Sequence, residues 1–294
     1  MIDPMVILFG LASIQGLTLL TSALTLSSPL ILAALGGLCS ERSGVVNIGL
    51  EGKMLGAACA AGIVGQLSGN PVLAVLAGIG VGTAFSLLHA LLTQTFRMDH
   101  IISGMGINAL AVGGTSLIAK TLSNQLSGRM ASFPIFIYWV AAWTAVVGIW
   151  WYLKSTRGGL RLNAVGNDPD KARQMGVNPV HVRLFALLWT GIFCGLGGTL
   201  IVTNAGSFSD EMTAGRGYIA LAALILGGWR PIPTLLACLA FGFFEAINLQ
   251  MQGQSFFGQT IPREFWQSLP YLVTLVALAG FLGKNKPPSG LGRP

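Results

Sequence analysis

The sequence has little charge. Only 9% of its 294 residues are Asp, Glu, Lys or Arg, whereas 53% are hydrophobic, and ordinary soluble domains carry roughly 25% charged residues. The deficit extends along the whole chain, which contains several apolar runs near the roughly 20 residues that a helix needs to cross about 30 Å of hydrocarbon. This composition excludes a soluble globular domain and predicts an integral membrane protein.

Motifs of catalysis and metal binding are also missing. The three histidines are far apart, and the four cysteines form no CxxC motif: His89, His100, His181, Cys39, Cys59, Cys194 and Cys238. We expect the cysteines to be small packing residues. There is no G-x-x-x-x-G-K-[ST] motif, so the chain does not cradle ATP by itself. We therefore expect no catalytic residue, no metal site and no cofactor in this chain.

The chain has few acidic residues, and its net charge is +7. The basic residues lie mainly between apolar runs, where they set membrane orientation, so we expect no nucleic-acid partner. The first ten residues lack the basic n-region of a secretory signal and continue directly into an apolar stretch, so we expect no cleaved signal.

The apolar runs predict an all-α integral membrane protein, a polytopic bundle of about 8–10 transmembrane helices. Residues 5–38 fit either one long tilted span or a tight pair separated at 25–29. The next apolar run ends near residue 66, and the others cover 72–96, 101–119, 133–153, 184–202, 217–226, 234–249 and 269–282. The run at 217–226 is short for a full crossing. We expect a transmembrane domain over 1–283 and a basic, disordered tail over 284–294.

The long polar interval 154–183 stands out because it contains a short helix with recognisable ends. Asp168 can act as N-cap, Pro169 suits the first helical position, and Gly176 can close the C-terminus. Asp170 in the first turn and Arg173 toward the last complement the helix dipole. A topological anchor needs only positive charge, so we favour a docking element for a cytoplasmic partner.

A cytoplasmic 154–183 interval gives a consistent topology. Counting spans places Arg97 and the basic tail on the same side, with Lys284, Lys286 and Arg293, and leaves Asp210, Glu211 and Glu264 outside. This distribution agrees with the positive-inside rule.

Polar residues in or near the spans are candidates for a translocation path, since they are costly to place in lipid. Asn47 and Glu51 share a face if their stretch is helical, although the surrounding glycines suit an interrupted helix. The alternative is that Glu51 pairs with Lys53 or Arg42.

Three further candidates lie within later spans. Asn108 either lines the path or forms an interhelical hydrogen bond. Glu245 and Asn248 are three residues apart on one helix face, where Glu245 could equally make an interhelical bond. For Arg216 and Arg230, which bracket the short apolar run, we expect interfacial anchoring.

Three stretches carry a family resemblance: ERSGVVNIGLEG at 41–52, AVGNDPDKARQMGV at 164–177 and GRGYIALAALILGGWRP at 215–231. Together they resemble the permease subunits of bacterial ABC importers of the branched-chain amino acid, ribose and nucleoside group. The first stretch is most similar to the nucleoside and simple-sugar branch. Lys53 departs from the pattern, because an apolar residue is expected there.

The resemblance implies a multi-pass protein of the bacterial inner membrane that works with partners. An extracytoplasmic solute-binding protein delivers the solute, and a second homologous permease subunit, often a different chain, completes the path. Cytoplasmic ABC ATPase subunits bind the ATP. They move the permease through its coupling helix, which would correspond here to Asp168, Pro169, Asp170, Lys171, Ala172, Arg173, Met175 and Gly176.

Two other classes of protein are alternatives to the permease. An ion-coupled secondary transporter of a small polar solute would need Glu51 or Glu245 to carry the ion, but it has no need of a capped cytoplasmic helix. An intramembrane enzyme would need clustered His, Asp or Cys residues, and the sequence shows no such cluster.

Overall fold

The computed structural model describes residues 4–122, 128–251 and 286–293, and the positions 255–256, 259–260, 268, 272 and 275. The helices, in chain order, are α1 (Pro4–Arg42), α2 (Leu50–Ser68), α3 (Pro71–Ala90), α4 (His100–Leu122), α5 (Ile135–Ser155), α6 (Arg157–Asn167), α7 (Pro169–Gln174), α8 (Pro179–Ala205), α9 (Arg216–Leu226) and α10 (Pro231–Met251). A π-helical turn, Leu91–Thr95, extends α3, and β1 (Ser255–Phe256) pairs antiparallel with β2 (Gln259–Thr260). The predicted all-α class is confirmed.

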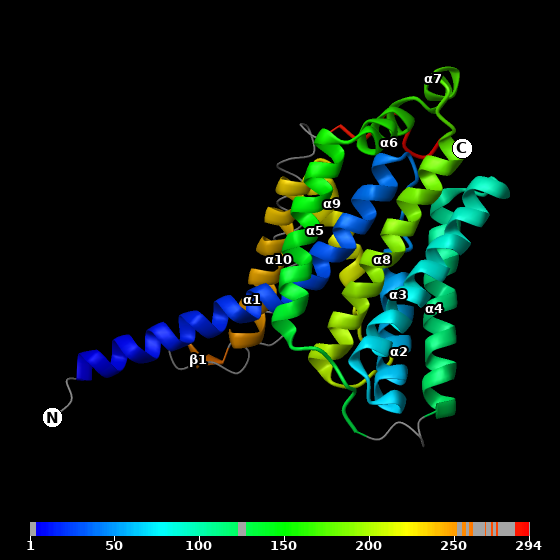
Figure 1. The fold of residues 1–294 in the computed structure, drawn as a ribbon. Coiled ribbons are helices and arrows are strands. Elements are labelled where there is room, and N and C mark those ends of the chain that lie inside the picture. Colours follow the sequence, from blue (N-terminus) through cyan, green and yellow to red (C-terminus); the bar gives the residue numbers. More distant parts are fainter. Residues whose placement is uncertain are drawn as a thin grey trace.

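The first helix answers the question that residues 5–38 left open. α1 is one continuous helix with Pro29 inside it. Proline removes a backbone hydrogen bond, and the hydroxyls of Ser27 and Ser28 donate to the carbonyls of Ala23 and Leu24 at 2.6 Å in the same turns. At 1.5 Å per residue α1 is about 58 Å long, and Figure 1 shows its N-terminal part extending away from the bundle.

Six of the described helices are long and apolar enough to cross a membrane: Gly16–Arg42, Pro71–Thr95, His100–Leu122, Ile135–Ser155, Pro179–Ala205 and Pro231–Gln250. α2 lies among them in the bundle (Figure 1). The predicted span 269–282 lies largely outside the described residues, as does Lys284.

Glycine allows the central helices to approach closely. A Cβ at Gly82 of α3 would lie 2.6 Å from the carbonyl oxygen of Gly191 in α8, and one at Gly195 would lie 2.6 Å from the Cα of Ile79. Since hydrophobic burial gives little drive between helices in lipid, such close packing is a main source of association. α8 is therefore held along its length against α3.

The short apolar run at 217–226 forms half of one crossing. The non-helical segment 206–215 follows α2 from Gly62, which Phe208 touches, to Glu51, which Thr213 contacts. This part of α2 covers about 16 Å, and the 11 residues of α9 cover about as much again. Together the loop and α9 match about 30 Å of hydrocarbon. Within this loop Gly206 and Thr213 are buried, whereas Ser207, Ser209, Asp210, Glu211 and Ala214 are exposed.

The polar elements gather at one end of the bundle. α6 and α7 project at the top of Figure 1, and the C-terminal residues lie beside them. Gln94, close to Arg97 in sequence, accepts from Arg183 Nη1 at 3.2 Å at this same end. The tail expected to be disordered is instead docked over 286–293, where Gly290 N donates to Gly166 O at 2.9 Å.

Candidate functional site

The capped helix that the sequence predicts is α7. Asp168 Oδ1 accepts from Lys171 N at 3.1 Å, and Pro169 is the first helical residue. The helix closes at Gly176, whose φ of 81° suits glycine and whose N–H donates to Arg173 O at 3.0 Å. Predicted caps and observed caps coincide.

α7 has one buried and one exposed face. Pro169 and Ala172 are buried against the protein, whereas the side chains of Lys171 and Arg173 are 80% and 67% exposed. Met175 is 84% exposed, an unusual position for a large apolar residue. The hydrogen bonds from Lys171 N and Nζ hold the pKa of the Asp168 carboxyl below its usual range. The helix thus presents charge and one apolar side chain to solvent.

A second amphipathic helix, α6, supports α7 and was not anticipated from the sequence. It begins where Thr156 Oγ1 accepts from Gly159 N at 3.1 Å, and it buries Leu162 and Val165. At its other end Gly166 lies so close to α1 that a Cβ there would run into the carbonyl of Arg42. The N-cap Thr156 and the spacing of the apolar residues were the signals in the sequence that could have indicated this helix.

Glu51 of α2 binds the junction between the loop 206–215 and α9. Its Oε1 accepts from Thr213 Oγ1 at 2.6 Å and from Gly215 N at 2.9 Å, while Oε2 accepts from Gly217 N at 2.6 Å. The carboxylate therefore satisfies N–H groups at the start of α9, where the helix dipole favours negative charge. The alternative pairing of Glu51 with Lys53 or Arg42 is wrong.

Asn47 does not share a helix face with Glu51, because α1 ends at Arg42 and α2 begins only at Leu50. The interruption expected here is present. Asn47 Nδ2 donates to Ser40 Oγ at 3.0 Å, and its Oδ1 accepts from Lys53 Nζ at 2.7 Å. Lys53, the departure from the family pattern, is fully buried, so Asn47 supplies part of the solvation that its ammonium needs.

Asn108 joins three helices. Its Oδ1 accepts from Gly52 N at 2.8 Å, and its Nδ2 donates to Ile48 O at 3.1 Å and to Tyr218 Oη at 2.9 Å. This is the interhelical bonding considered as the alternative to path lining. Asn108 and Glu51 both fix α9 beside α2, which explains their place in the bundle.

Glu245 of α10 pairs with Arg216, whose Nη2 donates to its Oε1 at 2.6 Å. Arg216 thus has a carboxylate partner in addition to any anchoring role. Arg216 also borders a cavity of about 340 Å³ whose polar groups include Thr25, Asn204 and Ser209. Asn248 lies one turn further along α10 and has its own polar interactions. Polar and apolar side chains therefore both line this region.

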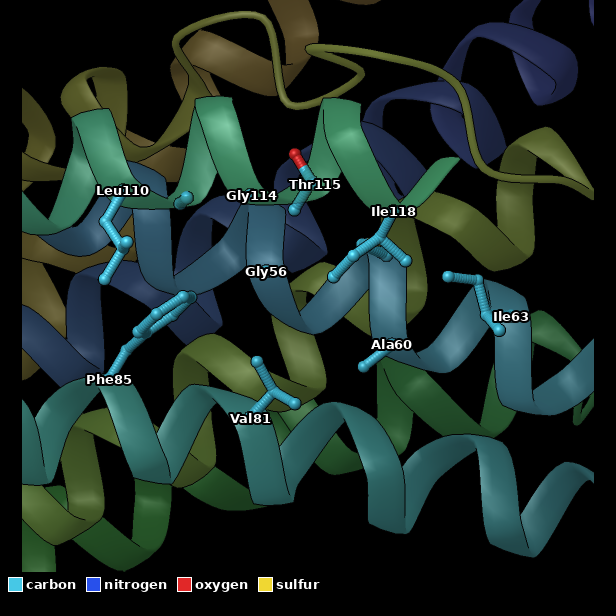
Figure 2. Close-up of a pocket in the computed structure, with 11 residues that line it drawn as sticks. Gly56, Ala60, Ile63, Val81, Phe85, Leu110, Gly114, Thr115 and Ile118 are labelled. Carbon is cyan, nitrogen blue, oxygen red and sulfur yellow. The ribbon is translucent and has the colours of Figure 1, made fainter. Parts of the chain in front are cut away.

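A second cavity, of about 290 Å³, is apolar. Figure 2 shows Val81 and Phe85 of α3 facing Leu110 and Ile118 of α4 across the glycine side of α2. Gly56 is needed here, because a Cβ would meet the Phe85 ring. Thr115 carries the only hydroxyl in its lining. The cavity therefore suits hydrocarbon better than a polar solute.

The described residues contain no group of three His, Cys, Asp or Glu that could hold a metal ion. Cys39, Cys59, Cys194 and Cys238 are all buried and unbridged. The candidate site comprises the helix contacts of Glu51 and Asn108, the cavity beside Arg216 and the exposed helix α7.

This architecture, with a half-helix in one crossing and a capped helix projecting from one end of the bundle, is that of a polytopic membrane protein. Residues 19–278 match the family described as the branched-chain amino acid transport system permease component. The chain belongs to that family, and it is the permease subunit of an ABC importer.

Two individual relatives cover nearly the whole chain, and a third covers about three quarters of it. The guanosine ABC transporter permease protein NupQ of Bacillus subtilis is 35% identical over 96% of this chain and 97% of its own length. The nucleoside ABC transporter permease protein NupC of Lactococcus lactis is 36% identical over 93% and 95%. The guanosine ABC transporter permease protein NupP of Bacillus subtilis is 22% identical over 76% and 72%.

Proposed function

We propose that the solute of this permease is a nucleoside. The observation that carries the proposal is the similarity to NupQ and NupC over more than nine tenths of the chain. The cavity beside Arg216 supports it, because its volume of about 340 Å³ falls within the range of ligand sites. Glu245 and Asn248 lie along the same part of α10, so they stay our candidates for the path.

Asn47, Glu51 and Asn108 were also candidates for the path. Their polar groups are used in helix contacts, so we propose that they shape the path rather than touch the solute.

The solute class can be tested in proteoliposomes that contain the complete transporter. We expect ATP-dependent uptake of radiolabelled guanosine, inhibited by excess unlabelled adenosine and unaffected by excess glucose or fructose. Uptake that sugars inhibit and nucleosides do not would contradict the nucleoside assignment and favour the simple-sugar branch.

The second part of the proposal is that α7 is the coupling helix that docks on a cytoplasmic ABC ATPase. Its rigid caps and its exposed Lys171, Arg173 and Met175 support this role. ATP is then bound and hydrolysed by the separate subunit, since this chain has no phosphate-binding loop motif. The ATPase can shift the inward- and outward-open states only through such differential contacts.

We further propose a second, non-identical permease subunit and an extracytoplasmic binding protein. NupQ and NupP are two guanosine permease proteins from one organism, and this chain is similar to both. A heterodimer of two such chains would form the path.

Co-purification tests the coupling assignment. The tagged chain, extracted from its native membrane in mild detergent, should retain an ATPase in stoichiometric amount, together with the second permease. Reversing the charges at Lys171 and Arg173 to Glu should release the ATPase without preventing membrane insertion. Arg157→Glu, an exposed charge reversal on α6, is the matched control. Retention of the ATPase by the double variant, or equal loss in the control, would show that α7 is not the docking helix.

A further inference from the structure

The C-terminal residues form a defined contact beneath α7. Gly290 N donates to Gly166 O at 2.9 Å, and Gly292 N donates to Gly44 O at 2.9 Å. Leu291 packs against the main hydrophobic core. The segment 288–293 therefore joins two parts of the chain that are far apart in sequence: the end of α6 and the turn that leads from α1 to α2.

A buried charge depends on this segment. Arg183 of α8 is only 2% exposed, and no carboxylate pairs with it in the part of the chain that is described. Its Nη2 donates to Arg293 O at 2.7 Å, and its Nε donates to Ser43 O at 3.3 Å. A buried guanidinium is costly unless it is hydrogen-bonded, and the carbonyl of Arg293 is one of the few acceptors that Arg183 has.

The contact reaches the base of the coupling helix itself. A Cβ at Gly290 would lie 2.8 Å from Gly166 O, 3.1 Å from Pro169 Cδ and 3.4 Å from Asn167 O. These three residues lead into α7. On the other side of the segment, a Cβ at Gly44 would lie 3.2 Å from the carbonyl oxygen of Gly290. Only glycine allows the segment to fit between these two surfaces.

We propose that residues 288–293 are a positioning segment that clamps the base of α7 to the 43–49 turn and to α8. A movement that the ATPase imposes on α7 is then passed to the 43–49 turn, which carries Asn47 and enters α2 next to Glu51. This inference rests on the proposed coupling role of α7, but the clamp itself is a property of this chain.

Gly290→Val tests the positioning role, with the exposed neighbour Ser289→Ala as its control. In the complete transporter in nanodiscs, we expect Gly290→Val to retain the ATPase and its basal hydrolysis. Uptake per ATP hydrolysed should fall by roughly 10- to 150-fold, the change that corresponds to losing the hydrogen bond from the charged Arg183 to Arg293 O. Ser289→Ala should leave the ratio unchanged. A purely structural role would lower yield and thermal stability with an unchanged ratio, and that result would overturn the proposal.

Hydrogen exchange separates this proposal from the coupling assignment. In the permease without ATPase, Gly290→Val should accelerate amide exchange in both 164–177 and 43–49, whereas Ser289→Ala should not. Unchanged exchange in these segments would overturn the clamp, whichever partner α7 binds. Failure of the wild-type chain to retain any ATPase would instead refute the coupling assignment and leave the exchange result standing.

Discussion

The substitution Glu51→Gln tests how the crossing formed by the loop 206–215 and α9 is held in place. The glutamine can keep its oxygen at the position of Oε1, where Thr213 and Gly215 donate. Its NH₂ group then faces Gly217 N–H, which donates to Oε2 in the native chain. The glutamine NH₂ and the Gly217 N–H are both donors, so neither has an acceptor there, and the negative charge at the start of α9 is lost.

The energetic cost follows from these contacts. A buried N–H without an acceptor costs about 1–3 kcal/mol, and a charge lost at a helix N-terminus costs about 0.3–2 kcal/mol. A combined cost of about 2–4 kcal/mol corresponds to a roughly 30- to 700-fold increase in local opening. Amide exchange over 206–217 should accelerate by a factor in this range, while exchange in α5 stays unchanged.

Glu211→Gln is the matched control, because Glu211 is an exposed carboxylate on the same segment. We expect exchange in this variant to equal that of the unsubstituted chain. If Glu51→Gln and Glu211→Gln exchange alike, the carboxylate does not hold the crossing. Lost transport with unchanged exchange would indicate that Glu51 lines the solute path instead.

Three other predictions concern single contacts. Trp229→Phe removes the 2.6 Å hydrogen bond from Nε1 to the buried Glu41 carboxylate and should destabilise the protein by about 1.5–3 kcal/mol, seen as a lower thermal midpoint. Gly198→Ala drives a Cβ into the Met54 carbonyl and should cost about 1–3 kcal/mol, whereas Gly80→Ala, which meets nothing within 4 Å, should be neutral or slightly stabilising. The lowered pKa of Asp168 makes its cap complete above the unfolded-state pKa near 3.9, with loss only as pH falls through the lower folded-state value. ATPase binding should therefore be constant from pH 6 to 8, and Asp168→Ala should weaken it equally throughout.

Local signals in the sequence predicted the local structure well. The caps of α7 lie within nine residues, so Asp168, Pro169 and Gly176 could be recognised without any tertiary contact. The same holds for the long spans, whose apolar length is a property of the segment alone.

Contacts between distant segments could not be predicted in this way. Glu51 was singled out as a polar residue in an apolar stretch, but its partners are 162–166 residues away. The glycine-rich end of the chain reads as flexible, yet Gly290 allows a close backbone approach to Gly166. Gly292 has a φ of 81°, which favours glycine, and its N–H donates to Gly44 O. α1 remained undecided because residues 25–29 interrupt the apolar pattern only weakly, and the structure continues the helix through Pro29.

Cross-linking from the tip of α7 tests the central claim most directly. All four native cysteines are buried, so Met175→Cys adds a single exposed thiol for a photoactivatable cross-linker. We expect an adduct with the ATPase subunit from this position and none from Ser68→Cys, an exposed position at the opposite end of the bundle. Absence of an ATPase adduct from residue 175 in a complex that contains the ATPase would contradict the assignment of α7 as the coupling helix.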